Sequence, residues 1–234
     1  MEINNNFRTE PSRVWLLIPC FNVAAYLPKL LGETSAHIPP ERTLLINDGS
    51  TDATSEVIAR FAVHMISHPR NLGKGAALKT GFNCLKEHKA EWCITMDGDG
   101  QHEAKYLPDF LEAAADGRYD LIIGNRQISG SDMPGDRRFS NWTTSRLLSL
   151  VTRQRILDAQ CGYRAIRMSA LTNLNLDCNR YDLETELLIK LAHSRQRIGW
   201  LSISTRYTSN HSSINRLTDT LRFIKVIAKL SWEC

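Results

Sequence analysis

Two aspartates, Asp97 and Asp99, follow directly after a short apolar run at residues 92–96. An uninterrupted apolar run of this length predicts a strand that is covered on both faces, as in a parallel sheet. Ligands of open α/β sheets bind outside the carboxyl ends of such strands, so both carboxylates are expected where chemistry takes place. Gly98 and Gly100 alternate with them, which lets the backbone turn and a bulky ligand approach closely.

The chemistry that such a pair of acids favours is the binding of a hard divalent cation. Cations of this kind take oxygen ligands and often bind one or two carboxylates together with substrate phosphates. Gln101 adds an amide oxygen two positions after Asp99. The pattern predicts a metal site that also holds a diphosphate, although a solvated acidic turn explains an isolated Asp-Gly-Asp as well.

Two other apolar runs, residues 14–20 and 43–46, also end in polar residues. Pro19 and Asn22 mark the end of the first, and Asp48 with Gly49 follows the second. Because the carboxyl ends of parallel strands meet at one edge of a sheet, we expect all three polar clusters to lie together there.

The elements that position these clusters alternate along the chain. We expect strands at residues 14–20, 43–46, 63–67, 92–96, 120–124, 163–168 and 200–207. We expect helices at residues 24–34, 53–61, 104–115, 142–151, 181–192 and 214–232, and a further helix that follows residue 75 and runs through residue 85. Ser50 or Thr51 is the expected N-cap of the second helix, and residues 129–138 read as a glycine-rich, charged loop. The alternation predicts an α/β fold with a mixed, mostly parallel sheet sandwiched by helices.

Composition narrows the class of protein. A chain of 234 residues with 42% hydrophobic and 23% charged residues has the values of one ordinary globular domain. The net charge of +4 fits an anionic substrate or a membrane surface and gives no argument for nucleic acid. The six cysteines show no C-x-x-C spacing, so reduced thiols in a cytosolic protein are expected.

The two ends of the chain have their own character. Residues 1–12 are polar and read as a flexible tail rather than a signal peptide. Residues 214–234 place apolar side chains at helical spacing between basic ones, which is typical either of a helix in a membrane interface or of a terminal helix packed on its domain. No apolar run is long enough to span a membrane. We therefore expect a cytoplasmic protein, peripheral at the cytoplasmic face of the membrane.

Taken together, the motifs resemble those of the family 2 glycosyltransferases of the GT-A type, and in particular the dolichyl-phosphate mannose synthase and polyprenyl-phosphate glycosyltransferase branch. The resemblance covers about residues 13–216, so residues 13–213 are expected to form the GT-A domain, with 214–234 part of it or appended to it. The matching segments are Ile18-Pro-Cys-Phe-Asn22, Asn47-Asp-Gly-Ser-Thr-Asp52, Asn71-Leu-Gly-Lys-Gly-Ala-Ala77, Asp97-Gly-Asp-Gly-Gln-His102, Gly124-Asn-Arg126 and Gln160-Cys-Gly-Tyr-Arg164.

The resemblance implies a binding site for a nucleotide sugar. Asp48 would accept hydrogen bonds from the base, and Pro19 and Asn22 would shape the base and ribose pocket. Lys74 would reach toward the donor; it is no P-loop lysine, since Gly75 follows it. The other donor-binding residues implied are Gly49, Asp97, Gly98, Asp99 and Arg126.

The resemblance also implies a metal site and phosphate clamps. Asp97, Asp99 and Gln101 would hold Mg²⁺ or Mn²⁺ against the donor diphosphate. Arg126 and Arg164 would clamp phosphate, because a guanidinium matches phosphate oxygens bidentately. Arg137 and Arg138 are weaker candidates for the same role.

The implied reaction is a single displacement that inverts the anomeric carbon. With a polyprenyl or dolichyl phosphate as acceptor the nucleophile is already an anion, and Glu184 would organise the acceptor side; Asp97, Asp99, Arg126, Arg164 and Glu184 are then the candidate catalytic residues. If the acceptor is instead a hydroxyl of a glycan or cell-envelope precursor, a base is needed, for which Asp158, Asp182 and Glu184 are candidates. Acids at a helix start also simply complement the helix dipole.

The donor and the rival functions stay open at this point. The resemblance to the mannose-phosphate synthases favours GDP-mannose as donor, whereas bacterial relatives of the same branch use UDP-glucose or another UDP sugar. Mannose or glucose is therefore the expected hexose. Lipid access is expected through peripheral membrane contact or a membrane partner protein. A nucleotidyltransferase would open with a glycine-rich loop that residues 18–22 lack. The remaining rival is a non-catalytic nucleotide-binding subunit, against which the intact acidic pair argues.

Overall fold

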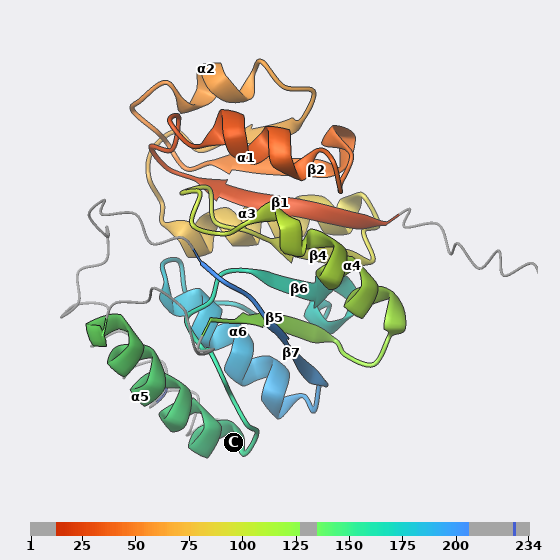
Figure 1. The fold of residues 1–234 in the computed structure, drawn as a ribbon, viewed down its shortest axis with the longest axis vertical. Helices are drawn as coiled ribbons and strands as arrows, with labels where there is room; N and C mark the ends of the chain where they lie inside the picture. The colour runs from red at the N-terminus through yellow and green to blue at the C-terminus, as the bar shows by residue number, and fades with distance from the viewer. Residues whose placement is uncertain (1–12, 127–134, 206–226, 228–234) are drawn as a thin grey trace, which may run out of the picture.

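The computed structural model describes residues 13–126, 135–205 and residue 227. Within these residues the strands form one seven-stranded sheet in the order β3-β2-β1-β4-β6-β5-β7 (Figure 1). Neighbouring strands are parallel except at β6, which is antiparallel to both β4 and β5. The strands are β1 (Val14–Cys20), β2 (Thr43–Asn47), β3 (His64–Ser67), β4 (Trp92–Thr95), β5 (Leu121–Asn125), β6 (Arg164–Arg167) and β7 (Ile198–Ser202). The predicted α/β fold with a mixed, mostly parallel sheet is confirmed.

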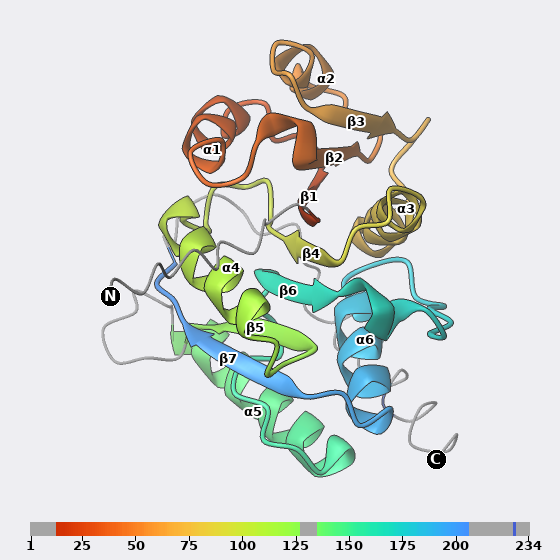
Figure 2. The same cartoon turned by 90° about the vertical axis from the view of Figure 1, so that its right-hand side faces the viewer.

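Helices cover both faces of this sheet. Figure 2 shows α1 and α4 on one face and α3 and α6 on the other. The helices are α1 (Leu27–Thr34), α2 (Thr54–Ile58), α3 (Lys74–Glu87), α4 (Leu107–Asp116), α5 (Gly135–Thr152) and α6 (Asp182–His193), with short 3-10 turns at Pro40–Arg42, Ala104–Tyr106 and Met168–Leu171. No helix among the described residues has both the length and the apolar character needed to cross a membrane.

The central strands form the core because they are covered from both sides. Every residue of β2 and β4 is buried, whereas three of the four residues of the edge strand β3 are exposed. Burial of each Leu or Ile side chain in such a core stabilises the fold by roughly 1.5–3 kcal/mol. This apolar centre fixes where the polar ends of the strands emerge.

The carboxyl ends of β1, β2 and β4 meet at one edge, as the sequence predicts. Cys20 of β1 pairs with Asn47 of β2, and Leu17 of β1 pairs with Thr95 at the end of β4. The reversed strand β6 brings its first residue, Arg164, to the same edge, where it pairs with Thr95. The Gln160–Arg164 motif therefore enters this edge from the amino end of an antiparallel strand.

Several predicted boundaries differ from the observed ones because contacts outside the local pattern decide them. Helix α5 begins at Gly135, inside the predicted loop 129–138. Helix α2 is shorter than predicted, and the Ser50 or Thr51 cap is wrong: Thr54 N–H donates instead to Asp52 Oδ1 (3.0 Å). Strand β7 ends at Ser202 because its pairing with β5 ends there.

Some predictions fall on residues outside the described ranges. These are the tail at residues 1–12, the loop residues 129–134 and most of the helix at 214–234, so the division into 1–12, 13–213 and 214–234 stays a prediction. Ile227 of that last segment is helical and buried. The five cysteines of the described residues are free, in agreement with the expected reduced thiols.

Candidate active site

The turn after β4 presents the two predicted acids at the carboxyl edge. Asp99 Oδ1 accepts a hydrogen bond from the Gln101 backbone N–H (3.0 Å), which closes the turn. Gly100 has a φ of 72°, a left-handed conformation that glycine adopts without steric cost. The turn is therefore short and fixed, and it holds Asp97 and Asp99 beside the end of β1.

Asp97 is held from three sides. Lys74 Nζ lies 2.6 Å from its Oδ1, and His102 Nε2 lies 3.5 Å from its Oδ2. A Cβ atom on Gly162 would stand 2.6 Å from Oδ2, so a larger residue at that position would displace the Asp97 carboxylate. Sequence reasoning assigned no role to His102 or Gly162; their signal was their place in two of the quoted motifs.

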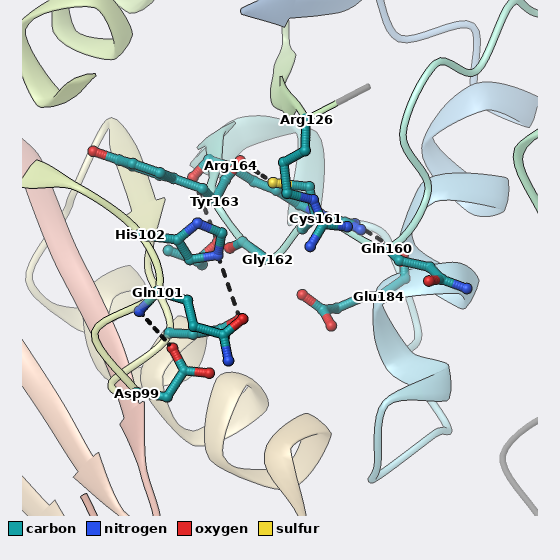
Figure 3. Close-up of polar contacts among 12 residues, drawn as sticks. Asp99, Gln101, His102, Arg126, Gln160, Cys161, Gly162, Tyr163, Arg164 and Glu184 are labelled. Atoms are coloured by element: carbon teal, nitrogen blue, oxygen red, sulfur yellow. Dashed lines mark hydrogen bonds and ion pairs between the residues drawn. The ribbon is translucent and has the colours of Figure 1, made fainter. Parts of the chain in front are cut away.

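Lys74 joins this acid to a second one from the other half of the chain. It is the first residue of α3, and its Nζ lies 3.2 and 3.1 Å from the two carboxylate oxygens of Glu184, in the first turn of α6. Burial disfavours the ammonium ion, but Asp97 and Glu184 outweigh this and raise the pKa of Lys74 above its ordinary value. Lys74 is therefore a fixed positive charge. In Figure 3, Glu184 extends from α6 toward the side of the site that bears Gln101 and His102.

The glycines beside Lys74 permit this meeting. A Cβ atom on Gly73 would lie 2.5 Å from the carbonyl oxygen of Asn179, and one on Gly75 would lie 2.6 Å from that of Arg180. The Ala76 N–H donates to the Asn179 carbonyl (2.9 Å). The start of α3 thus packs directly against the segment that leads into α6, which brings Lys74 and Glu184 together.

The pKa values of the two aspartates are shifted in opposite directions. Burial acts against ionisation of Asp97, but Lys74 and His102 outweigh it and hold the pKa of Asp97 far below its usual range. Burial, and then the charge of Asp97, raise the pKa of Asp99. Asp99 is therefore a carboxylate whose negative charge the protein alone compensates poorly.

Such a donor set fits a divalent cation in its chemistry. Asp97, Asp99 and the Gln101 amide supply hard oxygen atoms from one turn, and a cation beside Asp99 would offset its unfavourable charge. The part of the chain that the structure describes holds no group of three or more His, Cys, Asp or Glu side chains placed for a metal ion. Asp97 and Asp99 stay the predicted carboxylate ligands, and a pair of carboxylates suits a cation that is also bound by substrate phosphates.

The predicted nucleotide side of the site is formed by the turns after β1 and β2. Asn22 Oδ1 accepts a hydrogen bond from the Thr51 N–H (2.8 Å), and the Asn22 N–H donates to Ser50 Oγ (3.0 Å). Pro19, whose carbonyl lies 3.3 Å from the position of a Cβ on Gly98, joins this edge to the acidic turn. The residues predicted to bind the base therefore adjoin the predicted metal turn.

Asp48 binds the backbone of a neighbouring loop, a structural role that the sequence did not predict. It is only 3% exposed, and its carboxylate accepts hydrogen bonds from the backbone N–H groups of Leu72 (2.9 Å) and Gly73 (2.8 Å). His68 Nδ1 lies 2.7 Å from the same carboxylate. Asp48 thereby holds the loop that leads to Lys74. Gly49 allows this, since a Cβ there would stand 2.3 Å from the backbone of Arg70. Base recognition by Asp48 stays a prediction.

Arg126, a predicted phosphate clamp, is bound to an acid of the protein. Its Nε and NH2 donate to the two oxygens of Asp158 at 2.8 and 2.9 Å, and its backbone N–H donates to the same carboxylate at 3.0 Å. Asn141 also donates to Asp158 (2.8 Å). Arg126 therefore fastens the end of β5 to Asp158, which Asn141 also binds. Phosphate binding by Arg126 stays a prediction.

Arg164 is a second arginine with an internal role. It is 1% exposed, and its three guanidinium nitrogens donate to the backbone carbonyls of Cys161, Glu184 and Ala159 at 2.8–2.9 Å. The guanidinium is thus held by backbone carbonyls within the protein, and its role as a phosphate clamp stays a prediction. Arg164 fixes the backbone that carries Gly162 and Glu184.

The remaining candidates from the sequence are two acids proposed as bases and two arginines proposed as phosphate clamps. The Asp158 side chain is fully buried; burial alone would raise its pKa, but Arg126 lowers it below the ordinary value, which makes Asp158 a poor general base. Asp182 Oδ1 accepts the Arg180 N–H (3.0 Å) at the start of α6. Arg138 lies exposed on α5, and the Arg137 side chain lies outside the described part of the chain.

Comparison with models of protein families gives a match over most of the chain. A model described as glycosyl transferase family 2 matches residues 15–174, which contain the ends of β1, β2, β4 and β5 and the Gly162 segment.

Several curated relatives are named as transferases that act on lipid phosphates. The undecaprenyl-phosphate mannosyltransferase of Micrococcus luteus is 29% identical over 197 residues, which cover 80% of this chain and 80% of the relative. The UDP-N-acetylglucosamine–dolichyl-phosphate N-acetylglucosaminyltransferase of Methanococcus voltae is 25% identical, with 93% and 94% covered. The polyprenol monophosphomannose synthase of Mycolicibacterium smegmatis is 30% identical, with 70% of this chain and 65% of the relative covered.

Among solved structures, the fold is similar to glucosyl-3-phosphoglycerate synthase from Mycobacterium tuberculosis. Its complex with Mn²⁺, uridine diphosphate and glucosyl-3-phosphoglycerate gives a TM-score of 0.71 at 19% identity, and covers 95% of this chain and 80% of that one. A complex of the same enzyme with Mg²⁺ and uridine diphosphate gives a TM-score of 0.73, also at 19% identity, with 95% and 79% covered. At this identity the likeness establishes the fold.

Proposed function

This chain belongs to glycosyl transferase family 2, and we propose that it transfers a hexose, mannose or glucose, from a nucleotide sugar to a polyprenyl or dolichyl phosphate in a metal-dependent, inverting reaction. The observation that carries the proposal is the cluster of Asp97, Lys74 and Glu184 beside Asp99 at the carboxyl edge of the sheet. It combines two acids suited to a cation with a fixed ammonium group, a combination that suits a diphosphate leaving group.

The metal requirement follows from the acidic turn. Mg²⁺ or Mn²⁺, held by Asp97, Asp99 and Gln101, would supply positive charge that stabilises the departing nucleoside diphosphate. Lys74 adds a second positive charge next to Asp97. Since Lys74 is also bound to Glu184, it keeps an anionic partner when Asp97 is engaged elsewhere, and its Nζ stays directed into the site.

The acceptor side needs no strong base in this proposal. An oxygen of the acceptor phosphate, already anionic, attacks the anomeric carbon; the bond to the diphosphate oxygen breaks, and the nucleoside diphosphate leaves with the electron pair. This agrees with the state of the described acids near the site, because both oxygens of Glu184 are bound to Lys74 and Asp158 is buried against Arg126. Glu184 then acts by placing Lys74 and the acceptor side of the site.

The names of the relatives support a lipid phosphate as acceptor, and they divide over the donor. Mannosyl, glucosyl and N-acetylglucosaminyl transferases all occur among them, and the solved neighbours bind uridine diphosphate. GDP-mannose and a UDP sugar therefore both stay as donors to be tested.

The test is transfer of radiolabelled sugar from GDP-mannose, UDP-glucose and UDP-N-acetylglucosamine to a short polyprenyl phosphate, with Mg²⁺ or Mn²⁺ and after chelation. We expect label in the organic phase with one donor, only with metal, and loss of that label in Asp99→Ala. Donor hydrolysis that depends on metal, without labelled lipid, would leave the donor site standing and overturn the lipid acceptor; a hydroxyl acceptor with Glu184 as base would then be tested. If no donor is transferred or hydrolysed, the result would favour a non-catalytic subunit.

A further inference from the structure

Helix α5 presents its apolar side chains to the outside. The four large ones that are exposed lie on the outer side of the helix: Phe139 (69%), Trp142 (52%), Leu147 (37%) and Leu150 (75%). Residues 139, 142, 146 and 150 fall on one helical stripe, because side chains three and four positions apart are neighbours. The rings of Phe139 and Trp142 stack at 6.3 Å between centroids, and the Arg146 guanidinium lies 5.9 Å from the Trp142 ring centroid.

The inner face of the same helix is mainly polar. Its buried residues include Asn141, Ser145 and Thr152, with Leu148 as the apolar member. Asn141 donates to Asp158, and Ser145 Oγ accepts the Ala159 N–H (3.1 Å). A helix packed on a water-soluble domain normally has the opposite arrangement, with its apolar stripe inward. The polar inner face therefore explains how α5 is fixed, and the apolar outer face needs another partner.

The charges on α5 indicate the nature of that partner. Among the α5 side chains that the structure describes, the charged ones are Arg138 and Arg146, and Arg153 and Arg155 follow directly after the helix; all four are exposed. A helix with aromatic and leucine side chains beside arginines matches an anionic lipid surface, into which the apolar groups insert while the arginines reach headgroup phosphates.

We propose that the outer face of α5, defined by Phe139, Trp142, Arg146, Leu147 and Leu150, binds an anionic membrane surface. Figure 1 shows α5 at the outer border of the molecule, next to α6, the helix that carries Glu184. Asn141 ties α5 through Asp158 to Arg126 at the end of β5. The biological meaning of this surface rests on the proposed lipid acceptor: it would place the acceptor side of the active site at the membrane. It is separate from the predicted contact at residues 214–234.

The test is flotation of the full chain with vesicles of phosphatidylcholine alone or mixed with phosphatidylglycerol, without any acceptor lipid. We expect binding to the mixed vesicles. In Trp142→Ser/Leu150→Ser we expect binding to fall at least about tenfold, because two inserted apolar side chains are lost. In Arg146→Ser it should fall about fivefold, the effect of one basic residue near an anionic surface. Met65→Ser, which removes a 40% exposed apolar side chain on β3, is the matched control and should bind as the wild type does.

A second measurement reports insertion directly and does not depend on loss of binding. Trp142→Phe keeps an aromatic ring, so it should bind the mixed vesicles nearly as the wild type does. The quenching of tryptophan fluorescence by lipids brominated in their acyl chains should decrease in this variant. It should not decrease in Trp200→Phe, which removes a half-buried tryptophan of β7.

The proposal is overturned if the full chain does not float with the mixed vesicles, or if Trp142→Ser/Leu150→Ser and Arg146→Ser bind as well as the wild type while their thermal unfolding is unchanged. It is also overturned if the wild type elutes as a dimer and does not bind vesicles, and if Trp142→Ser/Leu150→Ser dissociates this dimer. The face is then an interface between two copies. Since the vesicles contain no acceptor, these results are independent of whether transferase activity is found.

Discussion

Acidic side chains of two kinds flank the same edge of the sheet. After β4, Asp99 has a raised pKa because it is partly buried and lies near the negative Asp97. On the β5 side, Asp158 is more deeply buried but has a lowered pKa, because Arg126 and Asn141 donate to it. The negative charge of Asp99 is poorly compensated by the protein and can be offset by a bound cation, whereas that of Asp158 is compensated within the protein.

This difference between Asp99 and Asp158 shows that residue type alone does not distinguish a side chain that binds a ligand from one that is bound within the protein. Arg126, Arg164, Asp158 and Lys74 are all charged and all lie near the edge, and the sequence offers each for a phosphate or a proton. Their partners distinguish them: two arginines are bound to Asp158 or to backbone carbonyls, whereas Lys74 bridges two acids of the site. The following substitutions test this contrast, from the largest expected effect to the smallest.

The largest effect is expected for Asp99→Ala. Transfer should fall on the order of 10³-fold, as when one preorganised group that stabilises transition-state charge is removed. The free energy of unfolding should not fall, because the substitution removes a partly buried charge that the protein compensates poorly. Initial rates at high donor concentration and urea denaturation without metal measure the two quantities. A large loss of stability would contradict the view that Asp99 is held for a ligand.

Asp158→Asn should show the reverse pattern. Breaking a buried ion pair leaves the partner charge uncompensated, so the free energy of unfolding should fall by about 3 kcal/mol. The matched control is Glu91→Gln in the exposed pair of Arg13 and Glu91, whose side chains are 56% and 65% exposed, and where the loss should be under about 1 kcal/mol. If Asp158→Asn abolishes transfer while stability is retained, Asp158 is part of the chemistry and the contrast fails.

Much of the first half of the fold was predictable because its signals are local. The runs that form β1, β2 and β4 are uninterrupted and apolar, and the observed strands differ from the predicted ones by at most one residue at either end. The meeting of their polar ends follows from parallel pairing. Asp97 and Asp99 were predicted for the same reason, since they come directly after β4.

The rest depended on contacts that no local pattern contains. Lys74 and Glu184 are 110 positions apart, and their pairing requires α3 and α6 to pack side by side. The reversal of β6 and the burial of Arg164 arise from the same long-range packing. The sequence showed an arginine in a motif, but it did not show that backbone carbonyls surround it.

Gly162→Ala tests the packing on which Asp97 depends. The added Cβ would lie within 2.6–2.9 Å of Asp97 and Lys74, so the carboxylate must move. We expect transfer to fall about 10- to 100-fold, the effect typical of disturbing a group that orients a metal ligand, and the metal concentration needed for half-maximal rate to rise. Gly32→Ala in α1 is the matched control, because a Cβ there meets nothing within 4 Å. Equal rates for the two variants would show that Asp97 has more freedom than the structure gives it.

The smallest effect is expected in the pH dependence of stability, and it concerns Asp158 again. Although burial opposes its ionisation, Arg126 lowers its pKa in the folded state. Its ionisation therefore stabilises the fold above the unfolded-state pKa of about 3.9, and this contribution is lost as the pH falls below that value toward the folded-state pKa. The difference in unfolding free energy between wild type and Asp158→Asn should consequently shrink below about pH 4, when measured by urea denaturation across that range. A difference that grows as the pH falls would mean that the pKa of Asp158 is raised in the folded state, as that of Asp99 is, and the distinction between the two acids would be lost.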